Sequence, residues 1–241
     1  MTTEDNSYFR SELLGSTSVK HAFLGRFDTP EELSATTTEI FGHPSEDVIT
    51  IDQVHGNDVL LLEKPLKKAS SYKKVEADAI ITALFNVPIA IRSADCLPIL
   101  LFDKKSCTIG AAHAGWRSTL AEVAKKTVEK MNKEFGSKPE NILAAFGPFI
   151  GACCYTVEPY LVKRFDKAGL DISSFLISDS STRLDLARAN RDQLIDAGIK
   201  KENISTKAPC TSCNTDRFYS YREEGEKTGR ELSIIMMGGN R

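Results

Sequence analysis

The chain has 241 residues, of which 41% are hydrophobic and 27% are charged, and its formal net charge is -2. These values are typical of a soluble globular protein that can bury a substantial core. The nearly neutral balance gives no basic footprint for nucleic acid, and no apolar run approaches the roughly 18 residues that a membrane span needs.

The N-terminal segment MTTEDNSYFR is polar and acidic, unlike a signal or transit peptide. In that context the six cysteines indicate reduced thiols of a cytoplasmic protein, available for chemistry or metal binding rather than for a disulfide framework. No internal repeat or low-complexity linker divides the sequence. We therefore expect a single domain over residues 1–241.

Strands dominate the prediction for the first half of the chain. Runs of β-branched and aromatic residues predict strands at 21–27, 48–55, 59–63, 77–84 and 87–95. Apolar residues at helical spacing then predict a helix over 120–135. Ser118 or Thr119 can serve as its N-cap, and Gly136 suits its C-terminal cap.

The second half alternates differently. Helices are expected at 158–169 and 184–198, each ended by a glycine, and strands at 203–209 and 232–237. The polar stretch between these two strands predicts a loop with functional potential. Strand groups separated by helices indicate an α+β fold with packed sheets and outer helices.

The stretch ADCLPILLFDKKSCTIGAAHAGW predicts a hairpin that carries both a cysteine and a histidine. The apolar runs 97–102 and 107–112 flank a polar break of four residues. If residue 102 pairs with residue 107, Cys96 lies opposite His113, and directly opposed Cβ atoms are roughly 4.5–5.5 Å apart. A thiol and an imidazole would then lie side by side on a rigid base.

This pair supports either nucleophilic catalysis by a thiolate or metal binding, and the simpler alternative is a buried thiol near a histidine. A third candidate, His55, ends its own apolar run, and the following Gly56 allows close backbone approach. Three nitrogen and sulfur ligands with an open fourth position are typical of a catalytic zinc site. A thiolate also favours zinc over magnesium or calcium.

Four further cysteines form the pairs Cys153-Cys154 and Cys210-x-x-Cys213. They could form a structural zinc site or a redox pair. Adjacent cysteines chelate one metal poorly, however, and CTSC has no partner CxxC at the usual spacing. Buried packing thiols are therefore the preferred interpretation. The nearby aromatic residues could stack on a purine or belong to the core, and the sequence leaves this open for Phe218, Tyr219 and Tyr221.

Seven motifs occur in a fixed order from about residue 48 to the C-terminus: QVHGNDV, ADAIIT, SADCLPILLFD, AAHAGWRSTLA, GPFIGACCYTVEP, LDLARANRDQL and FYSYREEGEKTGRELSIIM. Together they resemble the signatures of the YfiH family. That family was once labelled multicopper polyphenol oxidoreductases or laccases. It is now described as purine nucleoside phosphorylases with adenosine deaminase activity.

The resemblance implies a sandwich of two mixed sheets flanked by helices. It also implies one zinc ion, Zn²⁺, held by His55, Cys96 and His113, which would form the catalytic site. The implied substrates are phosphate and purine nucleosides such as adenosine, guanosine, inosine and methylthioadenosine.

The segment after the first strand, GRFDTPEELSATTTEIFG, is short and lacks the SLN-like motif of the family. Arg26 is matched there to the arginine that members usually carry, as a substrate or phosphate ligand. Ser118 replaces the usual glycine after GWR.

Phosphorolysis needs an anion site, and two features near Trp116 suit one. The N-terminus of the helix that follows it offers free backbone N–H groups, and Arg117 adds a bidentate partner. The alternative is that Arg117 pairs with a surface carboxylate. Asp78 and Asp95 are candidate acid–base groups or partners that orient the ligands.

Two other functions remain as alternatives. Some members of the family are described as editing peptidoglycan precursors, and a hydrolase of that kind needs the same generic site chemistry. The laccase function is disfavoured, because the chain has only four histidines and no His-x-His pair, whereas a multicopper cluster needs many imidazoles.

Overall fold

Two stacked sheets, the helices on their outer faces and a separate two-stranded sheet of β9 and β10 make up the fold of this computed structural model, which describes residues 7–65, 68–168, 173, 176–178 and 181–239. The strands are β1 (Tyr8–Phe9), β2 (Val19–Leu24), β3 (Val59–Leu62), β4 (Ala79–Thr82), β5 (Ile89–Ser93), β6 (Leu97–Asp103), β7 (Thr108–Ala114), β8 (Ile142–Phe146), β9 (Leu176–Ser178), β10 (Thr182–Leu184), β11 (Ile204–Ser205) and β12 (Glu231–Met237). The α-helices are α1 (Glu12–Gly15), α2 (Pro30–Phe41), α3 (Trp116–Leu120), α4 (Val123–Phe135), α5 (Pro159–Lys167), α6 (Leu186–Asp196) and α7 (Tyr221–Glu224).

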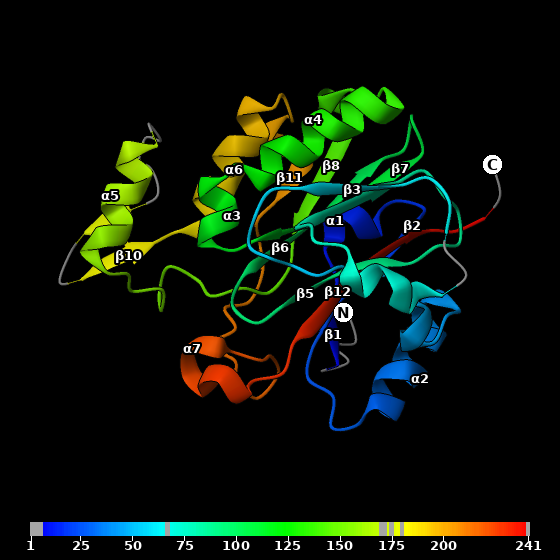
Figure 1. The fold of residues 1–241 in the computed structure, drawn as a ribbon, viewed down its shortest axis with the longest axis horizontal. Helices are drawn as coiled ribbons and strands as arrows, with labels where there is room; N and C mark the ends of the chain where they lie inside the picture. Colours follow the sequence, from blue (N-terminus) through cyan, green and yellow to red (C-terminus); the bar gives the residue numbers. More distant parts are fainter. Residues whose placement is uncertain (1–6, 66–67, 169–172, 174–175, 179–180, 240–241) are drawn as a thin grey trace.

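The larger sheet has six strands in the order β11-β8-β6-β7-β4-β3 and is mixed, because its two outer pairs are parallel. The smaller sheet, β1-β2-β12-β5, is antiparallel throughout rather than mixed. Helices α4 and α6 cover the outer face of the larger sheet, and α2 lies on the opposite side of the molecule (Figure 1). The predicted layered α+β architecture is confirmed.

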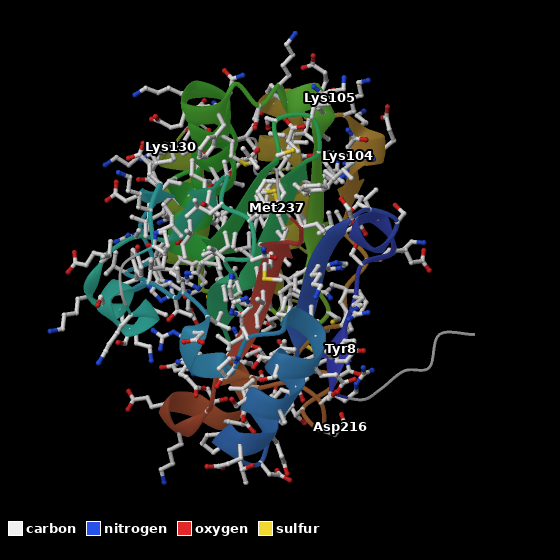
Figure 2. The ribbon with its side chains drawn as sticks, turned by 90° about the vertical axis from the view of Figure 1, so that its right-hand side faces the viewer. Tyr8, Lys104, Lys105, Lys130, Asp216 and Met237 are labelled. Carbon is white, nitrogen blue, oxygen red and sulfur yellow. The ribbon has the colours of Figure 1, made fainter. Side chains whose placement is uncertain are left out.

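The β6–β7 hairpin runs nearly the length of the larger sheet. Figure 2 shows Lys104 and Lys105 of its turn at one end of the molecule, and Asp216, in the loop before α7, at the other. The two ends of the fold are therefore far apart. Residues that start β6 or finish β7 lie away from the turn.

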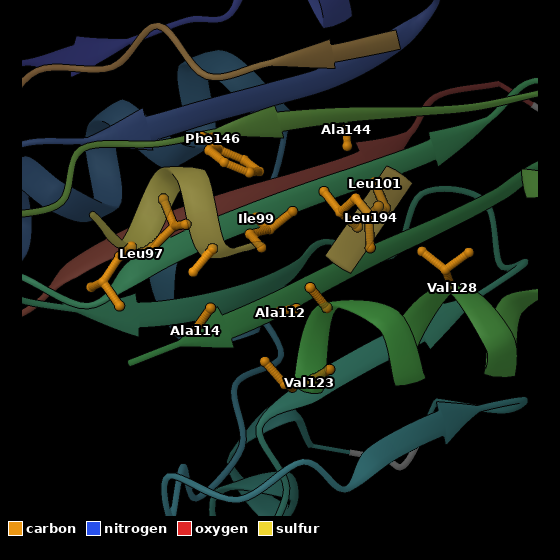
Figure 3. Close-up of a cluster of buried hydrophobic side chains, with 14 of the residues drawn as sticks. Leu97, Ile99, Leu101, Ala112, Ala114, Val123, Val128, Ala144, Phe146 and Leu194 are labelled. Atoms are coloured by element: carbon orange, nitrogen blue, oxygen red, sulfur yellow. The ribbon is translucent and has the colours of Figure 1, made fainter. Parts of the chain in front are cut away.

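Alternating side chains on β6 supply two separate cores. Ile99 and Leu101 point toward α4 and α6, where they pack with Val128 and Leu194 (Figure 3). Their neighbour Leu100 belongs to the core between the two sheets. Because successive strand residues face opposite sides, both faces of β6 are buried, and every one of its residues is buried.

A third, smaller core lies under α2 on the outer face of the antiparallel sheet. The helix begins where the Thr29 side chain accepts a hydrogen bond from the Glu32 backbone N–H, with Pro30 in the first turn. It ends at Gly42, whose φ of 80° suits glycine. The four layers are thus helix, sheet, sheet and helix. None of the helices within the described residues combines the length and apolarity that crossing a membrane requires.

The hairpin register differs from the prediction. Asp103 pairs with Thr108, so His113 lies opposite Pro98, and Cys96 lies just before the strand begins. The strands are longer than predicted and the turn is correspondingly shifted, with Cys107 at a φ of 51°. A shift of two residues preserves the face of the sheet, so Cys96 and His113 still meet.

Three other element predictions need correction. Residues 48–55 form only isolated bridges at Ile49 and Asp52 instead of a strand. The helix predicted over 120–135 is divided into α3 and α4, because Glu122 adopts a left-handed φ of 61°. The strand predicted at 203–209 is only β11 (Ile204–Ser205), which pairs with β8 at the edge of the larger sheet.

The remaining helix predictions hold over most of their length. Gly136 caps α4 in the left-handed conformation as expected. Helix α6 is followed by Gly198 at a φ of 97°, and α5 ends at Lys167. Gly169, which was predicted to end that helix, lies outside the described residues.

Candidate functional site

The structure brings His55, Cys96 and His113 together at one end of the larger sheet. Each offers a ligand atom, and these three atoms lie within 4.8 Å of one another. The two imidazole rings have their centroids 4.9 Å apart. His55 lies in the turn before β3, Cys96 immediately before β6, and His113 near the end of β7. Three separate parts of the chain thus converge on one point.

Asp78, just before β4, orients two of these ligands. His113 donates from Nδ1 to Asp78 Oδ1 over 2.8 Å, which leaves its Nε2 for a metal ion. The same carboxylate accepts the backbone N–H groups of His55 at 3.0 Å and Gly56 at 2.6 Å. Burial by itself raises the pKa of Asp78, but the hydrogen bond and charge of His113 outweigh it and lower the pKa. These contacts suit the orienting role, the second of the two expected for Asp78.

Backbone geometry also marks this place as a candidate functional site. A Cβ atom on Gly115 would lie 2.8 Å from Cys96 Sγ and 3.1 Å from His55 Nδ1, so only glycine lets the chain pass so close to both ligands. His55 and Asp95 both have left-handed φ angles, of 61° and 78°. Such conformations cost of order 1–3 kcal/mol each and cluster at functional sites.

Cys96 and His113 shift each other's pKa. Burial by itself raises the pKa of the Cys96 thiol, but the charge of His113 and hydrogen bonds from both histidines lower it below its usual value. Burial by itself lowers the pKa of His113, and the Cys96 thiolate and Asp78 raise it instead. A thiolate is the form of cysteine that binds metal ions.

These ligands open into a cavity of about 810 Å³, a size typical of small-molecule sites. Four arginines line it: Arg92, Arg117, Arg222 and Arg230. Among the described residues, the one carboxylate that lines it is Asp95, which already accepts hydrogen bonds from Thr211 Oγ1, Ser220 Oγ and the Arg222 backbone N–H. The cavity therefore presents positive charge to a ligand and suits an anion.

Of the two arginines expected to bind phosphate, the structure places only Arg117 at the cavity. Its guanidinium lies 4.3 Å from the centre of the Trp116 ring, and no carboxylate partner is found for it in the described part of the chain. Arg26 is held elsewhere, by an ion pair with Glu224 and a hydrogen bond to the Phe218 carbonyl. It does not line the cavity.

The expected helix N-terminal anion site is also weaker than predicted. Helix α3, which follows Gly115, has only five residues before the break at Glu122. So short a helix has little macrodipole. The arginines, rather than a helix end, provide the positive charge here.

Sequence reasoning missed Arg92, Arg222 and Arg230, which come from the end of β5, from α7 and from the segment just before β12. The last two lie within the motif FYSYREEGEKTGRELSIIM, and that match was the available signal. The aromatic residues of this motif were expected either to stack on a purine or to belong to the core, and the structure gives examples of both positions. Phe218 is buried in the fold, whereas Tyr221 is exposed and lines the cavity.

The four remaining candidate cysteines are not buried packing thiols, and that prediction is wrong. Cys153 and Cys213 are exposed, and Cys154 and Cys210 are partly exposed. Their sulfur atoms all lie within 4.8 Å of one another. The loop after β8 and the loop before α7 lie against each other and bring the four thiols together. The sequence did not predict this contact, because the two loops are far apart in the chain.

The donor set at His55, Cys96 and His113 fits zinc. Two imidazoles and a thiolate are ligands that zinc accepts, and the cavity leaves room for a fourth position. The carboxylate–histidine contact through Asp78 is the arrangement that usually supports such a ligand.

A layered α+β fold with two histidines and a cysteine facing an arginine-lined cavity defines a candidate metalloenzyme. The chain belongs to the family described as multi-copper polyphenol oxidoreductase laccase, whose model matches residues 26–238. A solved structure of YfiH from Bacillus licheniformis superimposes with a TM-score of 0.85 at 27% identity, covering 97% of each chain. The resemblance to the YfiH family is confirmed.

The names of curated relatives describe an activity, as two of them show. A purine nucleoside phosphorylase of Bacteroides thetaiotaomicron is 36% identical over 201 residues, which cover 80% of this chain and 74% of that protein. An adenosine deaminase named RL5, from an unknown prokaryotic organism, is 31% identical over 197 residues, covering 79% of this chain and 77% of RL5.

Proposed function

We propose that this protein is a zinc-dependent purine nucleoside phosphorylase that also deaminates adenosine. The observation that carries the proposal is the ligand set His55, Cys96 and His113 opening into a cavity with four arginines. The names of the relatives favour the same chemistry. The accepted nucleosides are expected to include adenosine, guanosine, inosine and methylthioadenosine.

In phosphorolysis, an oxygen of phosphate replaces the purine nitrogen at C1′ of the ribose, and the departing base takes up a proton. The reaction therefore needs an anion held beside the sugar. The four arginines that line the cavity are the groups available to hold it: Arg92, Arg117, Arg222 and Arg230. Guanidinium groups suit this task, because their planar forks can donate two parallel hydrogen bonds to phosphate.

His55, Cys96 and His113 would hold the zinc ion. Zinc held by three protein ligands supplies a Lewis acid with an open position, able to lower the pKa of water or to polarise an oxygen. Asp78 keeps the His113 ring in one orientation and its proton on Nδ1. Exposed Tyr221 offers an aromatic face at the cavity, and base stacking on such a face is favourable.

Deamination would use the same cavity with water in place of phosphate. Water adds to the purine ring carbon that carries the amino group, and ammonia leaves. The similarity to RL5 is the observation that favours this second activity. Both reactions place a nucleophilic oxygen beside a bound nucleoside, so one pocket can serve them.

Oxidation of phenols by several copper ions receives less support from the donor groups. Within the described residues, two groups of side chains could hold an ion, and His55 and His113 are the only histidines in either. His21 lies in β2, where it accepts a hydrogen bond from the Ser11 backbone N–H. A cluster of several copper ions would need more imidazoles in one place than the chain brings together.

Product analysis with adenosine tests the proposal. Adenine and ribose 1-phosphate should form only when phosphate is present, whereas inosine should form with or without it. Absence of turnover with every purine nucleoside tried would overturn the proposal and favour the peptidoglycan-precursor alternative. Oxygen consumption with phenols by a copper-loaded sample would instead favour the laccase alternative.

The two arginines singled out from the sequence provide a matched comparison. Arg117→Ala should weaken the phosphate-dependent route more than deamination, because its proposed partner is the anion. Arg26→Ala should affect both routes little, because Arg26 is held by Glu224 away from the cavity. Equal losses of both routes in Arg117→Ala, with phosphate KM unchanged, would remove Arg117 from the phosphate role.

A further inference from the structure

Four cysteines of two distant loops meet beside the cavity, outside the ligand set described above. Cys153 and Cys154 lie in the turn after β8, and Cys210 and Cys213 lie in the loop before α7. The Sγ atom of Cys213 lies 3.6 Å from that of Cys153 and 3.3 Å from that of Cys154. All four sulfur atoms are within 4.8 Å of one another.

Backbone pairing brings these loops together. Phe149 forms a parallel bridge with Cys210, and its N–H donates to the Pro209 carbonyl over 3.3 Å. The Thr211 N–H donates to the Phe149 carbonyl over 3.0 Å. The convergence of the thiols is therefore fixed by main-chain hydrogen bonds as well as by the cysteines themselves.

The spacing of the sulfur atoms suits a metal ion. Four thiolates at about 2.3 Å from a tetrahedral zinc ion lie about 3.8 Å from one another, close to the distances found here. A disulfide would need two sulfur atoms about 2.05 Å apart. Thiolate ligands select zinc over magnesium and calcium, and a closed set of four cysteines is a common structural zinc site.

The surroundings also fit a tetrathiolate site. The Gly151 N–H donates to Cys210 Sγ over 3.2 Å, a contact that stabilises a thiolate. A Cβ atom on Gly151 would lie 3.2 Å from Cys153 Sγ, so glycine makes room for the sulfur atoms. Any larger residue would crowd the position that the ligands need.

Two guanidinium groups from other elements donate hydrogen bonds to the loop that carries Cys153 and Cys154. Arg183 donates to the Ala152 carbonyl over 3.2 Å, and Arg222 donates to the carbonyls of Cys154 and Thr156 over 3.2 and 2.9 Å. Four thiolates around Zn²⁺ carry two negative charges in excess. Nearby arginines would offset that charge.

We propose that Cys153, Cys154, Cys210 and Cys213 bind a second zinc ion, which fastens the two loops that wall the cavity. On binding, each thiol that becomes a ligand releases its proton to solvent. The site acts on the cavity through its neighbours. Tyr155 and Arg222 line the cavity, and Thr211 donates to Asp95, which precedes the ligand Cys96. The second ion has a structural role, separate from the chemistry proposed for the first.

Zinc content of the purified protein tests this proposal. The wild-type chain should hold two zinc ions, and Cys213→Ser and Cys96→Ser should each hold one. The double variant should hold none. Cys107→Ser is the matched control and should keep both ions, because Cys107 lies in the hairpin turn, at the other end of the molecule from the loop that contains Asp216 (Figure 2). If the wild type held only one zinc ion and Cys213→Ser held one as well, the proposal would be overturned.

A measurement on unaltered cysteines covers the case in which Cys213→Ser fails to fold. Bound zinc should protect the four cluster thiols of the wild-type protein from iodoacetamide, and a chelator should expose them. Intact mass without reductant reports a disulfide as the loss of two hydrogens. A disulfide within the cluster, or no protection by added zinc, would overturn the proposal in favour of a redox pair or free thiols.

The structural role has its own test in Cys96→Ser, which should hold only the second ion. Chelation should lower the Tm of this variant, and added zinc should restore it. Cys96→Ser/Cys213→Ser should show no such shift. An unchanged Tm on removal of the second ion from Cys96→Ser would overturn the fastening role. These readouts do not depend on turnover, so they are separate from a failure of the proposed enzymatic function.

Discussion

Asp78 holds two of the three candidate metal ligands at once. Its Oδ1 accepts from the His113 ring, while both of its oxygens accept backbone N–H groups of the turn that contains His55. A buried carboxylate with three donors is well satisfied. One side chain thereby couples the end of β7 to the turn before β3, and the ligand geometry depends on it.

Replacement of Cys96 separates catalysis from stability. Cys96→Ala should abolish turnover of adenosine and change Tm little, because the three hydrophobic cores are formed without this thiol. Cys107→Ala should retain turnover, since Cys107 lies in the hairpin turn. Product assays and thermal unfolding check both. A loss of stability near the 2–5 kcal/mol of a core Leu→Ala change would mark the Cys96 site as structural instead.

Gly115 offers a second test that leaves all three ligands in place. In Gly115→Ala the new methyl group would meet Cys96 Sγ and His55 Nδ1, so the ligands must shift. We expect zinc affinity at this site to fall by roughly 10–100-fold, as for other disturbances around metal ligands. The control is Gly15→Ala, because nothing lies within 4 Å of a Cβ atom there. Equal zinc affinity in both variants would contradict the close approach at Gly115.

The sequence was sufficient to predict that His55, Cys96 and His113 lie together, because their residue types and neighbouring motifs indicate a shared site. It was insufficient for the arginines. Arg92 and Arg230 are far apart in the chain and meet only because β5 pairs with β12. Arg26 lacked any local feature that would reveal its partner Glu224, almost two hundred residues further along the chain.

At the level of elements, the β6–β7 hairpin shows what a pattern can specify. Apolar runs predicted two strands, and alternation fixed which face each residue takes. The register depended on the turn, where Cys107 adopts a positive φ that no sequence motif predicts. The observed strand pairing therefore differs from the predicted pairing by two residues. The break between α3 and α4 has a similar origin, because Glu122 takes a left-handed conformation without glycine or proline beside it.

Strand β2 carries a histidine that should make the fold sensitive to acid. Burial, with the charge of Arg10, lowers the pKa of His21 to about 4. The unfolded chain therefore binds a proton more readily than the folded one, and stability present above about pH 6.5 is lost as the pH falls toward 4. Between pH 7 and 5 this histidine should account for a loss of about 2 kcal/mol.

Urea unfolding at the two pH values checks this expectation. In His21→Gln, the amide oxygen can still accept from the Ser11 N–H that His21 now binds, and the loss between pH 7 and 5 should be smaller by about that amount. His43→Gln, outside the strands, serves as the control and should follow the wild type. An identical pH dependence in all three proteins would show that folding does not lower the pKa of His21.

On the scale of the whole molecule, the cavity forms where the ends of both sheets meet. Cys96 and His113 lie at one end of the larger sheet, whereas Arg92 and Arg230 come from the paired ends of β5 and β12 in the smaller one. The chain as a whole has a net charge of only -2. Its concentration of arginines at this one place is therefore a local property, which overall composition could not reveal.

The central claim is that His55, Cys96 and His113 together bind zinc. An anomalous difference map collected at the zinc absorption edge, from crystals of the natively purified protein, tests it most directly. We expect a peak for a zinc ion that both histidines bind and that lies about 2.3 Å from Cys96 Sγ. A metal held by the two histidines with the Cys96 sulfur more than about 3 Å away, or no zinc peak between these residues, would contradict the account.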